Sequence, residues 1–103
     1  MEYLKQFQKH IFDNQLAPLV SLWQEYSFCD EVDPNELKAI LNSLSQSPFA
    51  VSFGKYAEDI LTLWEKIPEG EEKRTVRRTV IFHILQSIPY FALQLDRPAH
   101  FAQ

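Results

Sequence analysis

The sequence predicts an all-α protein of about five helices, and three observations support this class. Apolar residues recur every three or four positions along most of the 103 residues, which is the spacing of one helical face. Only two residues are glycine, too few for an architecture built from β-hairpins. Aromatic residues form 14% of the chain, as is typical of a folded domain. We therefore expect one helical domain spanning residues 1–103.

The first two predicted helices are amphipathic and close together. The first runs from Tyr3 to Phe12, with Tyr3, Leu4, Phe7, Ile11 and Phe12 on one side. The polar residues 13–15 interrupt it. The second runs from Leu16 to about Tyr26 and tolerates Pro18 in its first turn, where the missing N–H has no intrahelical acceptor.

The third helix has the clearest start signal in the chain. Asp33 can cap the first free N–H groups, and Pro34 suits the first helical position. Glu36 lies three residues past the cap, where a reciprocal capping box places an acidic side chain. Residues 45–48 are polar and end in proline, so the helix is expected to stop there.

The last two helices are predicted over residues 53–67 and from Glu71 onward. Pro89 is expected to end the fifth helix, which leaves residues 90–103 as a tail without an assigned conformation. The apolar side of the fifth helix is defined by Val76, Val80, Ile81, Ile84, Leu85 and Ile88. Because Arg77 lies below the centre of the side carried by Val80, Ile81, Ile84 and Ile88, we expect the first turns of the helix to project beyond the core.

The chain matches itself at a shift of 41 residues, the separation of Trp23 and Trp64. Residues 19–23 align with 60–64, and Pro48 aligns with Pro89. The match predicts two related antiparallel helix pairs, one over about 16–47 and the other over about 53–89. Stacked pairs would form either an α-solenoid-like array or a small orthogonal bundle.

The first pair resembles a HEAT or armadillo-type repeat. The counterparts of the repeat's proline, turn aspartate and basic residue would be Pro18, Asp33 and Lys38. The connection over 24–32 is longer than a HEAT turn, and the second pair has Asp59 and Arg74 where the first has Pro18 and Asp33. The resemblance therefore implies only an architecture of helix pairs stacked side by side, and it implies no activity.

No catalytic, metal-binding or cofactor motif is evident, so we expect a protein that is not an enzyme and has no cofactor. His10, His83 and His100 lack ligand partners at metal-binding spacing, and His83 is interpreted as a partly buried structural residue. Cys29 precedes two acidic residues, which should raise its thiol pKa and reduce its reactivity. The adjacent carboxylates of Glu58 and Asp59 point about 100° apart on a helix and are interpreted as a solvated face.

Charge and hydropathy indicate a cytoplasmic protein with protein partners. The formal net charge of −4 gives no general attraction to nucleic acid. The first residues lack the basic and apolar regions of a secretory signal, and no apolar stretch is long enough to span a membrane. A single cysteine cannot form an internal disulfide, which fits a reducing compartment.

The candidate partner-binding residues lie in the fifth helix and just beyond it. Four of the ten basic residues are Lys73, Arg74, Arg77 and Arg78. Three interpretations compete: pairing with the nearby glutamates of the same chain, docking of an acidic protein segment, and contact with nucleic acid. Aromatic residues exceed what the apolar stripes hold, so some should be exposed; Phe82, Tyr90 and Phe91 join the candidate site as anchors.

By the same 41-residue correspondence, the acidic connection before the third helix and the basic start of the fifth should lie at one end of the molecule. These features favour a non-enzymatic protein–protein interaction module acting as an adaptor, chaperone or inhibitor. The alternative is a nucleic-acid-associated regulator that uses the basic start of the fifth helix. A homodimer would be one way to cover the exposed ends of so short an array.

Overall fold

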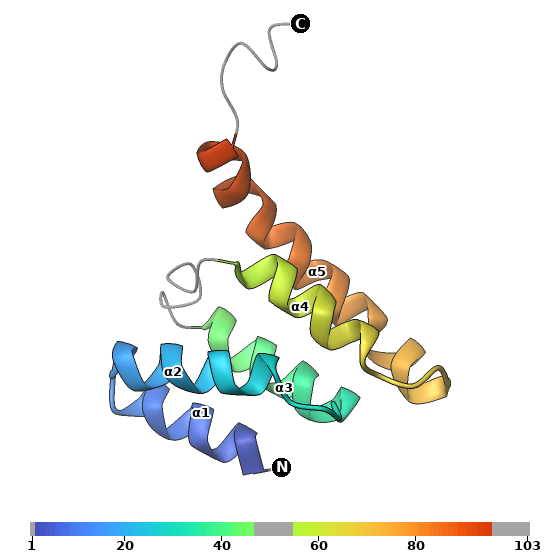
Figure 1. Cartoon of the computed structure of the whole chain (residues 1–103), viewed down its shortest axis with the longest axis horizontal. Helices are drawn as coiled ribbons and strands as arrows, with labels where there is room; N and C mark the ends of the chain where they lie inside the picture. The colour runs from blue at the N-terminus through green and yellow to red at the C-terminus, as the bar shows by residue number, and fades with distance from the viewer. Residues whose placement is uncertain (1, 47–54, 96–103) are drawn as a thin grey trace, which may run out of the picture.

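The computed structural model describes residues 2–46 and 55–95, with side chains up to residue 86. These residues form five helices and no strand, which confirms the all-α prediction (Figure 1). The helices are α1 (Glu2–Phe12), α2 (Leu16–Ser27), α3 (Pro34–Ser45), α4 (Tyr56–Glu65) and α5 (Glu71–Leu95). Phe53, where the fourth helix was predicted to begin, lies outside the described residues.

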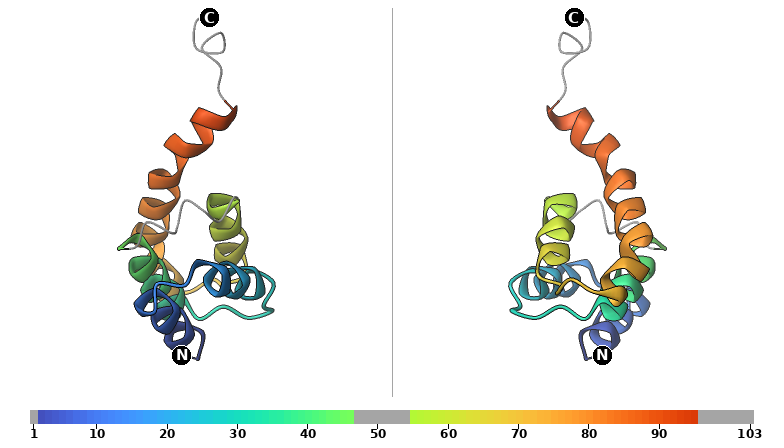
Figure 2. Two further views of the ribbon diagram at one scale, coloured as in Figure 1. Left: turned by 90° about the vertical axis from the view of Figure 1, so that its left-hand side faces the viewer. Right: turned by 90° about the vertical axis from the view of Figure 1, so that its right-hand side faces the viewer.

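The helices pack in a ring in which each has two main neighbours, in the order α1, α2, α4, α5, α3 and back to α1 (Figures 1 and 2). Helix α4 packs along α5, as expected of the second predicted pair. Helices α2 and α3, expected to form the first pair, instead both pack on α1. The reason is the apolar side of α1, whose Phe7 has 0% exposure and so belongs to the core.

Aromatic side chains fill the core between α1 and α2. The rings of Phe7 and Trp23 meet edge to face with centroids 6.3 Å apart, and those of Phe7 and Tyr26 do so at 5.9 Å. Tyr56 of α4 extends the cluster to within 5.1 Å of the Trp23 ring. Burial raises the pKa of the Tyr26 and Tyr56 hydroxyls above the ordinary value of about 10, so both stay protonated in alkaline solution that would ionise an exposed tyrosine.

The two caps predicted for α3 have different outcomes. Asp33 does cap the helix: its side chain accepts hydrogen bonds from the backbone N–H groups of Asn35 at 2.8 Å and Glu36 at 3.4 Å. The reciprocal capping box is wrong, because the Glu36 carboxylate accepts from the backbone N–H of Leu4 at 3.3 Å. Glu36 is buried and supplies a negative charge to the positive end of a different helix, α1.

Helix α5 departs from its predicted course in two ways. It continues past Pro89 to Leu95, since proline removes one intrahelical hydrogen bond and bends a helix without always ending it. Its first turns do not project beyond the core: Lys73 and Val76 are buried there. The last turns of α5 are the part that extends away from the other helices (Figures 1 and 2).

The turn between α1 and α2 leaves the side chain of Phe12 exposed. Asn14 takes a left-handed conformation with φ of 56°, which asparagine tolerates better than most residues. The backbone N–H of Gln15 closes the end of α1 by donating to the His10 carbonyl at 3.1 Å. Phe12, assigned from sequence to the apolar side, is 89% exposed at this turn.

Candidate protein-interaction surface

One side of α5 faces solvent and carries basic residues followed by apolar residues. We call it the basic–apolar stripe, and its described members are Arg74, Arg77, Arg78, Ile81, Phe82 and Leu85. Their spacing of three and four residues aligns them along one side of a helix over about 16 Å. All three arginines are exposed, and the exposed fractions of Ile81, Phe82 and Leu85 are 41%, 54% and 57%.

The opposite side of α5 forms the packed face and is defined by Val76, Val80 and His83. The His83 Nε2 atom lies 3.1 Å from Oδ1 of Asn42 on α3, so the ring links these two helices. Burial lowers the pKa of His83 because the charged imidazolium is poorly solvated there. The interpretation of His83 as a structural residue agrees with this position.

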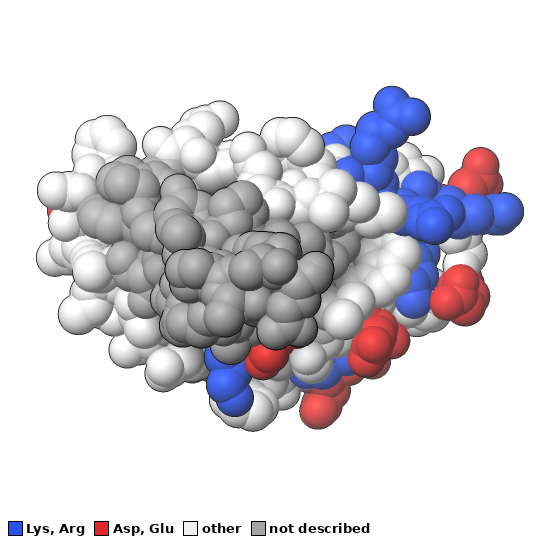
Figure 3. All heavy atoms as spheres, turned by 90° about the horizontal axis from the view of Figure 1, so that it is seen from above, with Lys and Arg blue, Asp and Glu red and all other residues white. Residues whose placement is uncertain are grey.

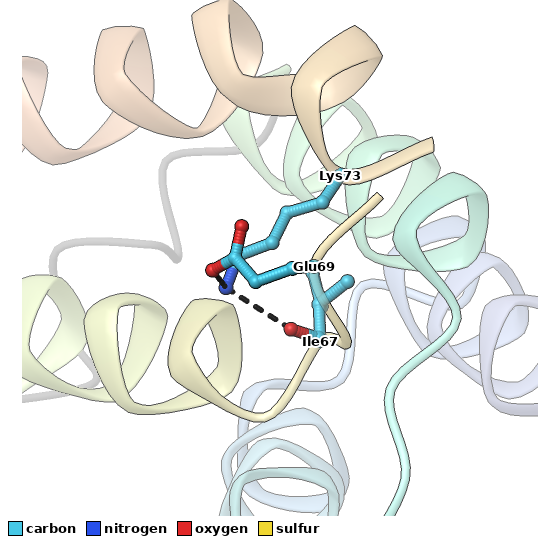
Figure 4. A network of polar contacts seen from close by, with 3 residues as sticks. All are labelled: Ile67, Glu69 and Lys73. Atoms are coloured by element: carbon cyan, nitrogen blue, oxygen red, sulfur yellow. Dashed lines mark hydrogen bonds and ion pairs between the residues drawn. The ribbon is translucent and has the colours of Figure 1, made fainter. Parts of the chain in front are cut away.

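Lys73 separates from the three arginines with which the sequence groups it. Its ammonium donates to the Ile67 carbonyl at 3.0 Å and to Glu69 Oε1 at 3.2 Å, as Figure 4 shows. It also lies 4.9 Å from the centroid of the Trp64 ring, a cation–π distance. With 7% exposure, Lys73 is occupied in holding the α4–α5 turn.

The three arginines make no ion pair with any described residue, although Glu71 and Glu72 are close in sequence. Among the described residues, pairing with nearby glutamates therefore explains Lys73 but not the three arginines. Seen from above, lysine and arginine atoms gather at the end of the molecule where α5 begins, with acidic atoms at its edge (Figure 3). Positive charge near a helix N-terminus opposes the helix dipole, so the arginines give α5 no stability of that kind.

Of the three aromatic candidates, the structure describes the side chain of Phe82. Phe82 is exposed, with its ring centroid 5.4 Å from that of His83. Tyr90 and Phe91 lie in the last turns of α5, and their side chains are outside the described part. Ile81 and Leu85 were assigned from sequence to the core and are instead members of the stripe. Arg74, Arg77 and Arg78, one or two turns earlier on the same side, were the signal that this side faces solvent.

The connection between α2 and α3 lies beside the end of α4, next to the start of α5. Lys66 donates to the backbone carbonyls of Ser27 and Cys29, each at 2.8 Å. A cleft at the α4–α5 turn is lined by Pro34 and by residues 67–73. The acidic and basic segments therefore do meet at one end of the molecule, and Phe28 is 82% exposed there.

Cys29 and Asp59 each make a hydrogen bond within the fold. The Cys29 thiol donates to the Glu31 carbonyl at 3.2 Å, and its pKa is raised, first by burial and then by Glu36 and Asp30 against the lowering effect of Lys66. Asp59 does not belong to a solvated face, because its Oδ2 accepts a hydrogen bond from Trp23 Nε1 at 2.9 Å. No set of three metal-ligating side chains gathers among the described residues. None of the described helices has the length and apolar character to cross a membrane.

Parts of two curated chlamydial proteins are similar to this chain, and both are named transcription elongation factor GreA. The protein from Chlamydia trachomatis serovar D is 43% identical over 76 residues, which cover 74% of this chain and 10% of that protein. The protein from Chlamydia pneumoniae is 42% identical over 81 residues, which cover 79% of this chain and 11% of that protein. This chain thus spans about a tenth of the length of these relatives. No family model matches it, and no solved structure does.

The resemblance to HEAT or armadillo repeats is wrong. The similarity found is to a segment of the GreA-named proteins, and none points to a HEAT repeat. In the structure, Asp33 caps α3 as an ordinary N-cap, and Lys38 makes none of the hydrogen bonds or ion pairs observed in the described residues. Local proline and aspartate signals mark helix starts in many all-α proteins, so they do not identify this repeat.

Proposed function

We propose that this chain is a non-enzymatic protein-interaction domain that binds a partner through the basic–apolar stripe of α5. The observation that carries the proposal is the exposure, on one side of one helix, of three arginines without described ion-pair partners and three large apolar side chains. Clustered apolar side chains bordered by arginine are typical of protein interfaces. A surface that served only solubility would not need Ile81, Phe82 and Leu85 on the same side.

The setting of this interaction is part of the proposal. The two similar proteins carry the name of a transcription elongation factor, so we look for the partner first among cytoplasmic proteins of the transcription apparatus. The match covers about a tenth of those proteins, and the proposal takes over none of their activity. An adaptor or an inhibitor fits the stripe equally well, because both require only a specific surface.

The test is affinity capture from the native cell with the wild-type chain and two variants. R74E/R78E reverses two exposed charges of the stripe, and K5E/K9E makes the same change in charge on the exposed side of α1. A partner retained by the wild type and by K5E/K9E, lost by R74E/R78E, and reconstituted with the purified partner would support the proposal. Equal capture by all three chains would refute it. Both positions are exposed, and a glutamate at position 74 in the first turn favours the helix dipole, so R74E/R78E should fold.

Nucleic-acid binding is the second candidate, favoured by the three exposed arginines and by the name of the relatives. Against it, the same side continues as an apolar row, and Glu69, Glu71 and Glu72 are exposed near its basic end. Phosphate contacts would make binding fall steeply with salt. A titration of fluorescent duplex DNA and single-stranded RNA at low salt decides this: a salt-dependent shift that R74E/R78E abolishes would favour the regulator over the protein-binding domain.

A further inference from the structure

We infer that the stripe receives an amphipathic α-helix of the partner, with acidic residues against Arg74 and Arg78 and apolar residues against Ile81 and Leu85. This inference rests on the proposed function and names the chemical class of its partner. It commits to a helix from another protein, rather than to an extended peptide or a second copy of this chain. Three features of the described residues support it: the shape of the stripe, the order of its charges, and the poor match between the stripe and the acidic side of α4 in a second copy.

The shape of the stripe suits a helix. Its six side chains form two neighbouring rows with a spacing of four residues, 74–78–82 and 77–81–85, and rows of this kind pack into the grooves of another helix. A peptide that docks as a β-strand pairs its backbone N–H and C=O groups with a sheet edge, and the described residues contain helices only. A helix satisfies its own backbone and brings only side chains to the interface.

The order of charges along the stripe specifies the partner further. The arginines occupy the first half and the apolar side chains the second, so the two kinds do not alternate. A complementary helix therefore carries its acidic residues one or two turns to one side of its apolar row. Because no described acid pairs with the arginines, the acidic residues of the partner would meet cations that are not already neutralised.

A second copy of this chain offers a weaker match for a docking helix, because its acidic connection between α2 and α3, where Phe28 is 82% exposed, is not helical. The exposed side of α4 is acidic, with Glu58 and Glu65 on either side of Leu61. Leu61, 48% exposed, is the one large apolar residue that this side presents to solvent. It would leave most of the apolar row of α5 uncovered. The acidic residues also lie on both sides of the leucine, whereas the stripe has its charges at one end.

The experiment selects a phage-displayed library of random 16-residue peptides on the wild-type chain, with R74E/R78E used for counter-selection. The expected consensus has apolar residues at intervals of three and four, with aspartate or glutamate at one end. The most enriched peptide, labelled and measured by fluorescence anisotropy, should bind R74E/R78E and I81S/L85S about tenfold more weakly. Its affinity for K5E/K9E should equal that for wild type, and its helical circular dichroism should increase on binding.

Charge reversal in the peptide completes the test. Replacing its acidic residues with lysine should remove binding to wild type and restore binding to R74E/R78E. A proline-rich or patternless consensus, or binding without a gain in helix, would overturn the inference. If the captured cellular partner still depended on Arg74 and Arg78 in that case, the proposed function would stand. Sedimentation showing wild-type dimers that R74E/R78E dissociates would replace the partner helix with a second copy.

Discussion

At the scale of single residues, Lys73 and Arg74 are neighbours in sequence with opposite environments. Replacing Lys73 with alanine removes a buried stem and the donor to the Ile67 carbonyl. We expect the free energy of unfolding to fall by about 1–3 kcal/mol. Arg74→Ala, at an exposed position, should leave it nearly unchanged. Urea denaturation of both variants measures the difference, and equal losses would show that Lys73 does not hold the α4–α5 turn.

His83 makes the stability of the fold depend on pH. Its pKa is lowered in the folded chain, so the unfolded chain binds the proton more readily. The contribution of neutral His83 is complete above the unfolded pKa of about 6.5 and is lost as the pH falls below it. We expect the free energy of unfolding to decrease between pH 7 and 5, by at most about 1.4 kcal/mol per pH unit for this one proton.

The control for this prediction is His83→Gln, which keeps a side-chain amide near Asn42 and does not titrate. Denaturation of the variant across the same range should show a smaller decrease than the wild type. A wild-type slope that the variant retains in full would assign the dependence to other groups.

At the scale of helices, local chemistry in the sequence predicted most boundaries correctly. Asp33 and Pro34 set the start of α3, because an N-cap and a first-turn proline act on adjacent residues. The prediction that Pro89 ends α5 is wrong, since a proline inside a helix is tolerated when the helix can bend. The sequence also could not predict that the Glu36 carboxylate accepts a hydrogen bond from Leu4, because the two residues are 32 positions apart.

Apolar periodicity alone does not show which side of α5 is buried, although the three arginines indicate which side is exposed. Ile81 and Leu85 are as apolar as Val76 and Val80, so the helix has two apolar sides and the pattern alone does not choose between them. Contacts with α3 and α4 make the choice. Of the predicted site residues, the arginines and Phe82, chosen from clustering and composition, are exposed. Lys73 is buried, which the sequence could not show because its burial depends on the path of the α4–α5 turn.

The link between α2 and α4 includes a hydrogen bond from Trp23 to Asp59 beside the contact of the Trp23 and Tyr56 rings. Asp59→Ala removes the acceptor that the Trp23 indole N–H uses, and we expect a loss of about 1–3 kcal/mol in stability. Asp59→Asn keeps an acceptor oxygen and should lose less. Thermal unfolding followed by far-UV circular dichroism would compare the two. A wild-type melting temperature for Asp59→Ala would mean that the bond adds nothing to the junction.

At the scale of the whole molecule, the ring of contacts predicts cooperative unfolding. In a stacked array each helix pair contacts only the next, whereas here α1 contacts both α2 and α3 and so closes the ring. Trp23 lies beside Phe7 of α1, and Trp64 lies on α4 next to Lys73. Tryptophan fluorescence therefore reports on both sides of the ring. We expect its urea transition to coincide with that of far-UV circular dichroism, as two-state unfolding requires.

Phe7→Ala tests directly whether α1 closes the circle of helix contacts. The ring of Phe7 is fully buried against Trp23 and Tyr26, so the variant should lose about 3–5 kcal/mol, a large part of the stability typical of a small domain. If the five helices unfold as one unit, the transitions measured by tryptophan fluorescence and by circular dichroism shift together to lower urea concentration. In independent helix pairs, Trp23 would unfold early while the helical signal of α4 and α5 remained, and the two curves would separate. Phe12→Ala, at an exposed position on the same helix, is the matched control and should leave both curves in place.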